Sequence, residues 1–432
     1  MSAARTAALR IRTEVERGRR LDRAFGATVE GLAERDRAFV HELTYGTTRL
    51  RGRLDHLIGL HVDRGLSSLD ATVLEVLRLG AYQALYMHSV PVFAAVSEAV
   101  DQVREVAGPR PTGLVNAVLR KVAERGDGPD AYPDPERDPL GFLETWGSHP
   151  RWLVERWLAR WPFETVKTLV ETDNRRPKTF LMALDLGTDA VLERLERAGI
   201  AAESVADGPT CVRLPEGAHP ATALAAVPGS IIQDPAAGLV ARYADVPSGT
   251  VVADLCAAPG GKALAVSGRA AHLLAADLSE PRIRMVKENS RRTGRAVSCV
   301  VADALRPPLR QADVVLLDVP CSGTGTLARH PDARWRLEPE GIRRFAGLQD
   351  RMLEAAVGLV PPGGLLVYST CTLEPEENED RIDRFLGTHA DFGIDSTGAV
   401  PGEMMDAEGR LSIMPWSAGF DGAFAARMRR TG

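Results

Sequence analysis

The chain has 432 residues, of which 44% are hydrophobic, and a formal net charge of −5. This length predicts two or three domains, each able to bury a core of its own. The small negative charge excludes a protein that coats nucleic acid through bulk charge, so any RNA contact must come from local patches. The first residues carry charges throughout and lack the apolar core of a signal peptide. Because no stretch approaches about 18 uncharged apolar residues, we expect a cytoplasmic protein without a membrane span.

The number and spacing of the cysteines exclude a disulfide framework and a structural zinc site. Their number is odd and no two of them form a C-x-x-C pair. We therefore expect free thiols that are available for chemistry, and no metal. The cysteines are Cys211, Cys256, Cys299, Cys321 and Cys371.

The first part of the chain, residues 1–125, is predicted to be all helical. Apolar residues recur there at a spacing of three to four, as in Val73, Leu74 and Leu77. Residues 126–144 are predicted to be a linker. Within them, 126–139 holds four prolines and two glycines, which argues against regular structure.

Residues 145–235 are predicted to form a small α+β unit that mixes helices with short strands. The run 180–184 suits a strand and 188–198 a helix. Trp152, Trp157 and Trp161 are spaced as on one helical face. We expect this stripe to pack in a core rather than to stack on bases.

The last predicted domain, residues 236–432, alternates short apolar strands with helices. Apolar runs that end in polar residues are typical of parallel strands covered on both faces, and the alternation predicts a doubly wound α/β sheet. Ligands bind such sheets beyond the carboxyl ends of the strands. The expected strands are 251–256, 272–278, 299–305, 314–321 and 365–371.

Three of these strand ends predict a pocket for an adenosyl group. The first strand leads into a loop of small residues and two glycines, which lets the backbone approach a ligand. This loop is not a phosphate-binding P-loop, because Cys256 replaces the first glycine and Ala263 follows the lysine. Asp277 at the second strand suits ribose hydroxyls and Asp303 at the third suits an adenine amino group, although either alone could cap a helix. The loop residues are Cys256, Ala257, Ala258, Pro259, Gly260, Gly261 and Lys262.

The next two strands end in Cys321, close to Asp318, and in Cys371. A thiolate that adds to C6 of cytosine makes C5 able to attack a methyl sulfonium. Asp318 could hold the ring N3 and the amino group while charge develops. The residues alone do not decide which cysteine attacks and which assists.

Several motifs resemble those of the bacterial small-subunit rRNA cytosine-5 methyltransferases of the NOL1/NOP2/Sun family. The resemblance implies a Rossmann-like class I methyltransferase domain that uses S-adenosylmethionine. It implies Cys371 as the nucleophile and Cys321 as the residue that assists product release. It also implies that the 256–262 loop, Asp277, Asp303 and Asp318 contact the cofactor. The motifs are CAAPGGK (256–262), DLSEPRIRMVKEN (277–289), ADA (302–304), DVPCSGTGTLARHPDARWR (318–336) and YSTCTLEPEENE (368–379).

The N-terminal half resembles the NusB-like RNA-binding helical domain, for example in 35–55 and 77–91. Within the family, this pairing of domains implies a substrate in 16S rRNA, either free or in an assembling subunit, and a monomer is the default expectation. The segment 329–336 is expected to meet RNA through Arg329, Arg334, Trp335 and Arg336, with a structural loop as the alternative.

The chain departs from the family pattern at two places. Val319 stands where alanine is usual, and Ala423-Phe424 stands where two aromatic residues are usual. Neither change touches a proposed catalytic atom. Two other functions remain open: an inactive RNA-binding or assembly protein, and the same chemistry on tRNA.

Overall fold

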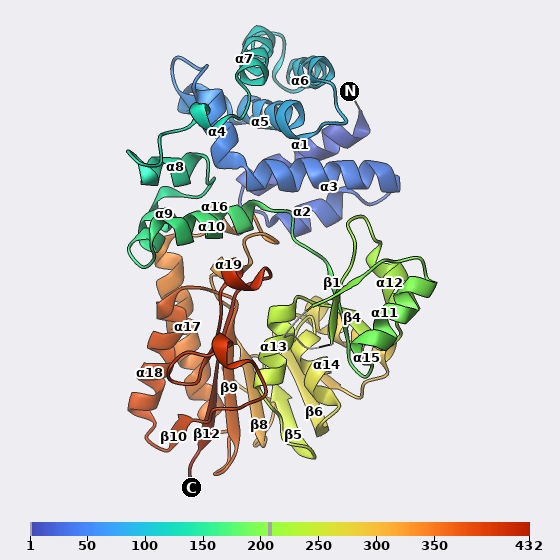
Figure 1. Cartoon of the computed structure of the whole chain (residues 1–432), viewed down its shortest axis with the longest axis vertical. Helices are drawn as coiled ribbons and strands as arrows, with labels where there is room; N and C mark the ends of the chain where they lie inside the picture. The colour runs from blue at the N-terminus through green and yellow to red at the C-terminus, as the bar shows by residue number, and fades with distance from the viewer. Residues whose placement is uncertain (1, 206–209) are drawn as a thin grey trace. The chain divides into compact units, whose positions relative to one another are not determined.

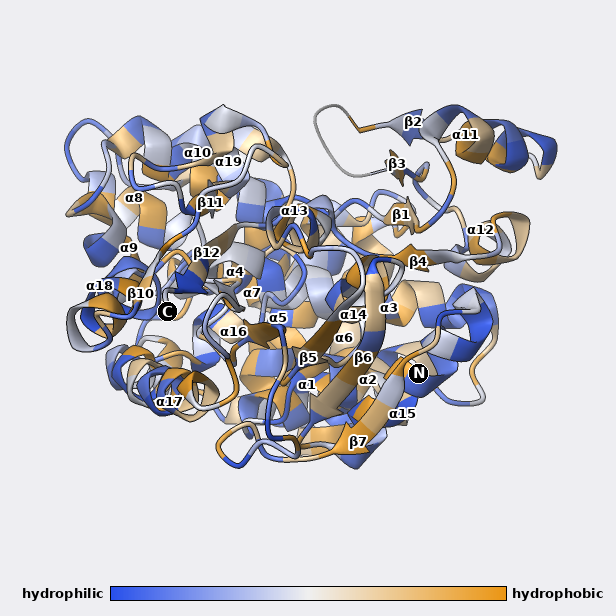
Figure 2. Cartoon of the chain, turned by 90° about the horizontal axis from the view of Figure 1, so that it is seen from below, coloured by the Kyte–Doolittle hydropathy of each residue, from blue (hydrophilic) through white to orange (hydrophobic). Residues whose placement is uncertain are grey.

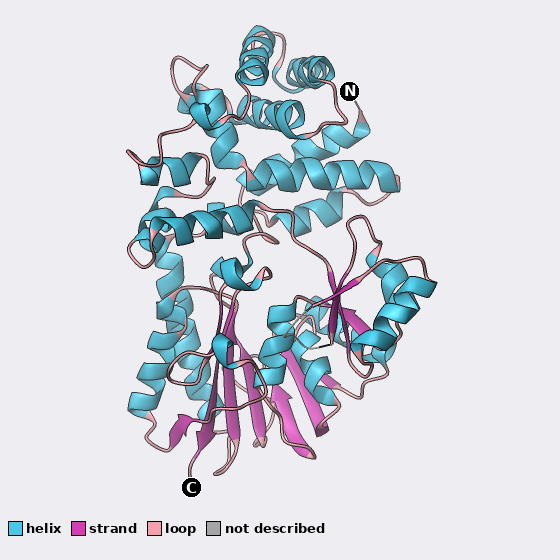
Figure 3. Cartoon of the chain, in the orientation of Figure 1, coloured by secondary structure: helices cyan, strands magenta, loops and turns pink. Residues whose placement is uncertain are grey.

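The computed structural model describes residues 2–205 and 210–432, and the chain forms two compact units (Figure 1). Unit 1 consists of Met1–Arg176 together with Leu327–Arg336. Unit 2 consists of Pro177–Thr326 together with Leu337–Gly432. All strands of the described residues belong to unit 2 (Figure 3).

The described part of unit 1 is helical, which confirms the prediction for residues 1–125. Its α-helices are α1 (Ala3–Glu16), α2 (Leu21–Thr28), α3 (Glu34–Arg49), α4 (Arg51–Gly59), α5 (Ala71–Tyr86), α6 (Val92–Ala107), α7 (Thr112–Arg125), α8 (Pro139–Thr145), α9 (Arg151–Leu158), α10 (Phe163–Asn174) and α16 (Ala333–Arg336), and its 3-10 helices are η1 (Leu66–Ser68) and η2 (Pro129–Ala131).

Local chemistry fixes the ends and the packing of these helices. Asp70 caps α5 by accepting hydrogen bonds from the backbone N–H groups of Thr72 and Val73. Helix α3 packs closely on α5, because a Cβ atom at Gly46 would lie 2.0 Å from the ring of Tyr82. The structure corrects the expectation for 126–139, since η2 forms there with Pro129 in its first turn, a position that suits proline.

The prediction that the tryptophan stripe packs in a core is confirmed for Trp157. Trp157 on α9 is fully buried. Helices α8 to α10 belong to unit 1, whereas the strands that follow belong to unit 2. The chain therefore passes from one unit to the other within the segment 145–235. The boundaries of the predicted domains stay predictions.

Unit 2 begins with a small antiparallel sheet in the order β2-β3-β1-β4. Buried Leu181, Val191 and Val212 join this sheet to its helices in one core. The elements are β1 (Phe180–Ala183), α11 (Thr188–Arg197), β2 (Glu203–Ser204), β3 (Cys211–Arg213), α12 (Pro220–Ala226) and β4 (Ser230–Ile232).

A larger sheet follows in the order β10-β12-β9-β8-β5-β6-β7, with β11 paired to β12. Strands β9, β8, β5, β6 and β7 run parallel to one another, whereas β12 pairs antiparallel with β9, β10 and β11. The strands are β5 (Thr250–Asp254), β6 (Ala270–Asp277), β7 (Ser298–Val301), β8 (Val314–Asp318), β9 (Leu365–Thr370), β10 (Phe392–Ile394), β11 (Leu411–Ile413) and β12 (Ala423–Arg430). The helices are α13 (Pro235–Tyr243), α14 (Gly261–Ser267), α15 (Glu280–Thr293), α17 (Pro339–Val357), α18 (Glu379–Thr388), α19 (Pro415–Ala418), η3 (Thr324–Thr326), η4 (Pro375–Glu377) and η5 (Gly402–Met404).

Both faces of the larger sheet are covered, as its apolar strands predict. On β8, Val315 and Leu317 pack in the core that includes α17 and α18. Val314 and Leu316 pack in the core that includes α13, α14 and α15. Figure 2 shows β5, β6 and β7 coloured mainly as hydrophobic. The α/β Rossmann-like fold predicted for the C-terminal part is confirmed.

No helix within 2–205 or 210–432 combines the length and the apolar character that crossing a membrane requires.

Candidate active site

The candidate site lies at the carboxyl ends of β5 and β8. These neighbouring strands end at Asp254 and Asp318. The order of the strands reverses between them, because β6 follows on one side of β5 and β8 lies on the other. This reversal opens the crevice in which doubly wound sheets bind ligands.

The loop after β5 depends on its two glycines. The N–H of Ala257 donates to the carbonyl of Ala276 (2.8 Å), which fixes the loop to the end of β6. Gly260 has a φ of +107°, and a Cβ atom there would lie 3.2 Å from Val286. A Cβ atom at Gly261 would lie 2.3 Å from Nε2 of Gln233. At both positions a side chain would meet protein atoms, so the glycines allow the loop to pack closely against α15 and the segment after β4.

The two predicted acidic residues both stabilise turns after their strands. Asp277 is buried and accepts from the N–H of Ser279 (2.9 Å), and it pairs with Arg282 at 3.3 Å. Asp303 lies two residues beyond the end of β7 and accepts from the N–H of Leu305 (2.9 Å). Their contacts with a cofactor stay predictions.

The chemistry of this crevice fits an adenosyl group. Carboxylates that can accept from hydroxyl and amino groups lie at the end of β6 and just after β7. The lysine of the loop, Lys262, donates to Oδ2 of Asp318 at 2.8 Å, so its charge is already balanced within the site. This arrangement suits a ligand without phosphate.

Asp318 is held from two sides. Lys262 donates to one oxygen, and the hydroxyl of Ser369 donates to the other at 2.8 Å. Ser369 lies opposite Asp318 in the pairing of β8 with β9. Burial alone would lower the pKa of Lys262, but the charges of Asp318, Cys371 and Asp254 outweigh it and raise that pKa. Lys262 is therefore a permanent positive charge in the site.

Asp254, next to this pair, is 1% exposed. Burial and the charge of Asp318 raise its pKa to about 7. Burial and the same carboxylates also raise the pKa of the Cys256 thiol, so Cys256 stays protonated near neutral pH.

The structure brings Cys321 and Cys371 together. Their Sγ atoms are 3.4 Å apart, and both are free thiols. The hydrogen bond to Cys371, burial and the charge of Glu377 raise the pKa of Cys321 well above its ordinary value. Cys321 is therefore a thiol near neutral pH. Val319, between Asp318 and this loop, packs its side chain in the core under the sheet.

The sequence reasoning missed a buried polar network behind the two cysteines. Glu377 accepts from the N–H of Ser322 and from Gln349 Nε2, both at 2.9 Å. Thr372 lies 2.6 Å from Ser322 through their hydroxyl oxygens. The only signal in the sequence was the acidic run 374–379 inside a motif, and its length gives no indication of which carboxylate turns inward.

The structure corrects the expectation for Arg334. Its side chain is 0% exposed, and it donates to the carbonyl groups of Ser148 and Asp173 (both 3.1 Å) and to Oδ1 of Asn174 (2.8 Å). A guanidinium buried among these acceptors is not available to an RNA phosphate. Trp335 is half-buried, and its indole N–H donates to the carbonyl of Thr48 at 2.8 Å. The structural alternative therefore holds for Arg334, and RNA contacts of Arg329, Trp335 and Arg336 stay predictions.

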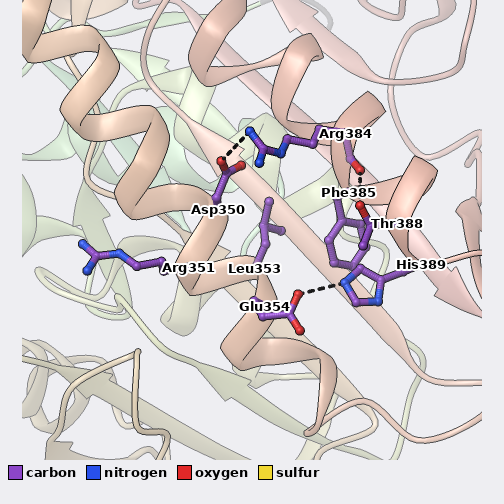
Figure 4. A pocket seen from close by; sticks show the side chains of 8 residues that line it. All are labelled: Asp350, Arg351, Leu353, Glu354, Arg384, Phe385, Thr388 and His389. Atoms are coloured by element: carbon purple, nitrogen blue, oxygen red, sulfur yellow. Dashed lines mark hydrogen bonds and ion pairs between the residues drawn. The ribbon is translucent and has the colours of Figure 1, made fainter.

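A pocket on α17 and α18 contains none of the predicted residues (Figure 4). In it, His389 pairs with Glu354 at 2.9 Å and Arg384 with Asp350 at 3.5 Å. These ion pairs link α17 to α18 and the residue that follows it, and we assign the pocket no part in the site. Across the described ranges, no group of three or more His, Cys, Asp or Glu residues is arranged to hold a metal ion.

Three family models match the chain. They are the 16S rRNA methyltransferase RsmB/F at residues 244–429, the NusB family at 2–124, and an RsmF/B-like ferredoxin-like domain at 149–219. The chain is 34% identical to a ribosomal RNA small subunit methyltransferase B of Klebsiella pneumoniae subsp. pneumoniae, over 92% of this chain and 93% of the other. It is 32% identical to the protein of the same name from Salmonella typhi, over 98% and 97%.

Two solved structures share the fold. One is described as the crystal structure of PH0851, with a TM-score of 0.79 and 26% identity over 98% of both chains. The other is NSun6 from Pyrococcus horikoshii with SFG, with a TM-score of 0.56 and 20% identity over 66% of this chain and 98% of that one.

The Rossmann-like unit and its loop define the class of this protein as a methyltransferase, with S-adenosylmethionine as the methyl donor. The identity to the Klebsiella and Salmonella proteins extends over almost the whole chain. The chain belongs to the 16S rRNA methyltransferases of the RsmB/F family, with a NusB-family domain at its N-terminus and a ferredoxin-like domain between. The predicted family, fold class and cofactor are thus confirmed.

Proposed function

We propose that this protein methylates C5 of a specific cytidine in 16S rRNA through a covalent bond between Cys371 and C6 of the base. One observation carries the proposal: the two thiols lie 3.4 Å apart at the strand ends that also hold Asp318. The names of the curated relatives, which refer to small-subunit ribosomal RNA, support the class of substrate.

The proposed reaction begins at Cys371, with which the cation Lys262 interacts. In the first step the sulfur of Cys371 forms a bond to C6, and the electron pair of the 5,6 double bond moves into the ring. Asp318, held by Lys262 and Ser369, would accept a hydrogen bond from the amino group, and from the ring nitrogen N3 once that nitrogen has taken up a proton. C5 then accepts the methyl group.

Release reverses the first bond. C5 loses its proton to a base, the 5,6 double bond forms again, and the pair of electrons in the carbon–sulfur bond returns to Cys371 as a thiolate. We assign the assistance of this release to Cys321, whose Sγ atom lies 3.4 Å from that of Cys371.

The residues proposed to hold S-adenosylmethionine are the 256–262 loop, Asp277, Asp303 and Asp318. When bound, this cofactor supplies a methyl group already activated on a sulfonium, so the enzyme contributes mainly alignment. We further propose action in the cytoplasm as a monomer, with Arg329 and Arg336 as contacts to RNA.

Bisulfite sequencing of total RNA tests the substrate. In a strain that lacks the gene, we expect one 16S rRNA cytidine to lose its protection from conversion and to regain it with the wild-type gene but not with Cys371→Ala. Loss of protection in a tRNA instead would show the same chemistry on another substrate. Unchanged protection of every rRNA cytidine would reject the proposal.

A further inference from the structure

Cys321 and Cys371 form a pair of free thiols in direct contact. Their Sγ atoms lie 3.4 Å apart, and both residues are partly exposed. They follow the neighbouring parallel strands β8 and β9, which bring them to the same edge of the sheet. An oxidant that reaches this edge therefore meets a preformed pair of sulfur atoms. The other three cysteines lie on separate elements, with Cys211 on β3, Cys256 in the loop after β5 and Cys299 on β7.

The backbone holds the loops of the two cysteines together. The N–H of Gly325, in the η3 turn after Cys321, donates to the carbonyl of Cys371 at 3.0 Å. A Cβ atom at Gly325 would lie 2.9 Å from that carbonyl oxygen, so the close approach requires glycine. Gly323 has a φ of +71°, and a Cβ atom there would lie 4.0 Å from the sulfur of Cys371. The loop of Cys321 thus turns directly beside the second cysteine.

Side chains also connect the residues that follow the two cysteines. The hydroxyl oxygens of Ser322 and Thr372 lie 2.6 Å apart. Glu377, which is 0% exposed, accepts from the N–H of Ser322 at 2.9 Å and from the hydroxyl of Thr372 at 3.4 Å. A buried network of this kind restricts its members to one arrangement, because a displaced group loses its hydrogen bond without gaining water. These contacts act on both loops alike, and they keep the two sulfur atoms next to each other.

Thiols placed in this way favour one product of oxidation. When a sulfur atom takes up one oxygen from a peroxide, it becomes a sulfenic acid. A second sulfur beside it displaces that oxygen as water, and a disulfide forms. The bond is about 2.0 Å long, so sulfur atoms that start 3.4 Å apart need to move little. Because the second thiol is already in contact, its attack precedes that of another peroxide molecule, which would give an irreversible sulfinic acid.

We propose that Cys321 and Cys371 are a redox modification site, which a peroxide converts to a disulfide within one chain and which a dithiol reductant restores. The two thiols lose two electrons and two protons, the O–O bond of the peroxide breaks, and hydrogen peroxide leaves as two molecules of water. The consequence for methylation rests on the function proposed above. While the disulfide exists, Cys371 has no thiol to add to C6 of the base, so the enzyme is reversibly inactive.

The test exposes the full chain, without RNA or cofactor, to hydrogen peroxide. The remaining thiols are blocked with N-ethylmaleimide, and the unreduced protein is digested with trypsin and analysed by mass spectrometry. We expect a disulfide-linked pair of peptides that contains Cys321 and Cys371, and we expect dithiothreitol to separate the pair. In Cys321→Ser, which lacks the second sulfur, Cys371 should become a sulfinic acid several-fold faster than in the wild type.

Cys299→Ser is the matched control, because Cys299 is also partly exposed but lies on β7. It should leave the yield of the linked peptides unchanged. The inference is wrong if the linkage joins two chains or involves Cys256, or if both thiols stay reduced in peroxide that oxidises free cysteine. It is also wrong if Cys371 becomes a sulfinic acid as fast in the wild type as in Cys321→Ser. Should Cys321→Ser not fold, the linkage in the wild type alone decides.

The outcome is separate from that of the RNA experiment, because no substrate is present. An absence of 5-methylcytidine there would reject the proposed function and leave the disulfide standing. An absence of the disulfide would reject this inference and leave the proposed function standing.

Discussion

Asp254 and Asp318 end neighbouring strands of the larger sheet, and only one of them has a cation as partner. Lys262 pairs with Asp318 at 2.8 Å. Asp254 is buried and accepts from the N–H of Cys256 at 3.2 Å. At neutral pH Asp254 is therefore close to its protonation midpoint of about 7.

This raised pKa predicts a dependence of stability on pH. Asp254 has a pKa of about 7 in the folded protein against an ordinary value of 3.8, so between these limits the folded state binds a proton that the unfolded state releases. The contribution of Asp254 to stability is therefore lost as pH rises from about 4 to about 7. Asp254→Asn imitates the protonated acid, so its melting temperature should rise relative to the wild type over this range. Each pKa unit corresponds to about 1.4 kcal/mol. A constant difference between the two proteins from pH 4 to pH 8 would contradict the shift.

The roles proposed for the two thiols predict opposite phenotypes. With Cys321→Ala, release should fail while attack proceeds, so a covalent protein–RNA complex should accumulate. Cys371→Ala should form neither the complex nor the product. Denaturing gels with labelled 16S rRNA fragments would show the complex as a slow band. Accumulation with Cys371→Ala instead would exchange the two assignments.

Among the elements, the segment Leu327–Arg336 belongs to a different unit from the residues on either side of it in sequence. It follows the loop of Cys321 and η3 in sequence, yet it belongs to the helical unit. Arg334 anchors it through acceptors from Ser148, Asp173 and Asn174, and Asp332 accepts from the N–H of Leu21 at 3.2 Å. The segment is thus a structural part of unit 1, although the residues before and after it in sequence belong to unit 2.

Arg334 is expected to matter for stability. Arg334→Lys keeps the charge but loses the planar fork, so several buried carbonyl groups lose their donor. We expect a loss of about 2–4 kcal/mol in the free energy of unfolding, measured by urea denaturation. Arg336→Lys, in the same segment but with a side chain 35% exposed, is the control and should change stability by less than about 0.5 kcal/mol. Equal effects of the two substitutions would contradict the role of Arg334.

For the whole molecule, the sequence predicted the elements that have a regular apolar pattern. It did not predict contacts between residues far apart in the chain. Apolar runs indicated the parallel strands, because a strand covered on both faces must be apolar along its length. Strand ends then located Asp318, Cys321 and Cys371. The contact of Glu377 with Ser322 joins residues 55 positions apart, and no periodicity marks such a partner.

The same limit explains the error at Arg334. Before the fold is known, an arginine beside a tryptophan in a polar loop suits contact with RNA as well as it suits a structural role. Only the structure supplies the acceptors from Ser148 and Asp173, which lie more than 150 residues earlier in the chain.

The place of Leu327–Arg336 also bears on how such a protein can be divided or recombined. The chain passes between the two units at three points, after Arg176, Thr326 and Arg336. A gene fusion with one junction at residue 176 would include the helices before that residue but not Arg334. The acceptors on Ser148, Asp173 and Asn174 would then lose their donor. The N-terminal unit is therefore not a detachable module, and a chimaera between relatives must exchange both segments together to keep it intact.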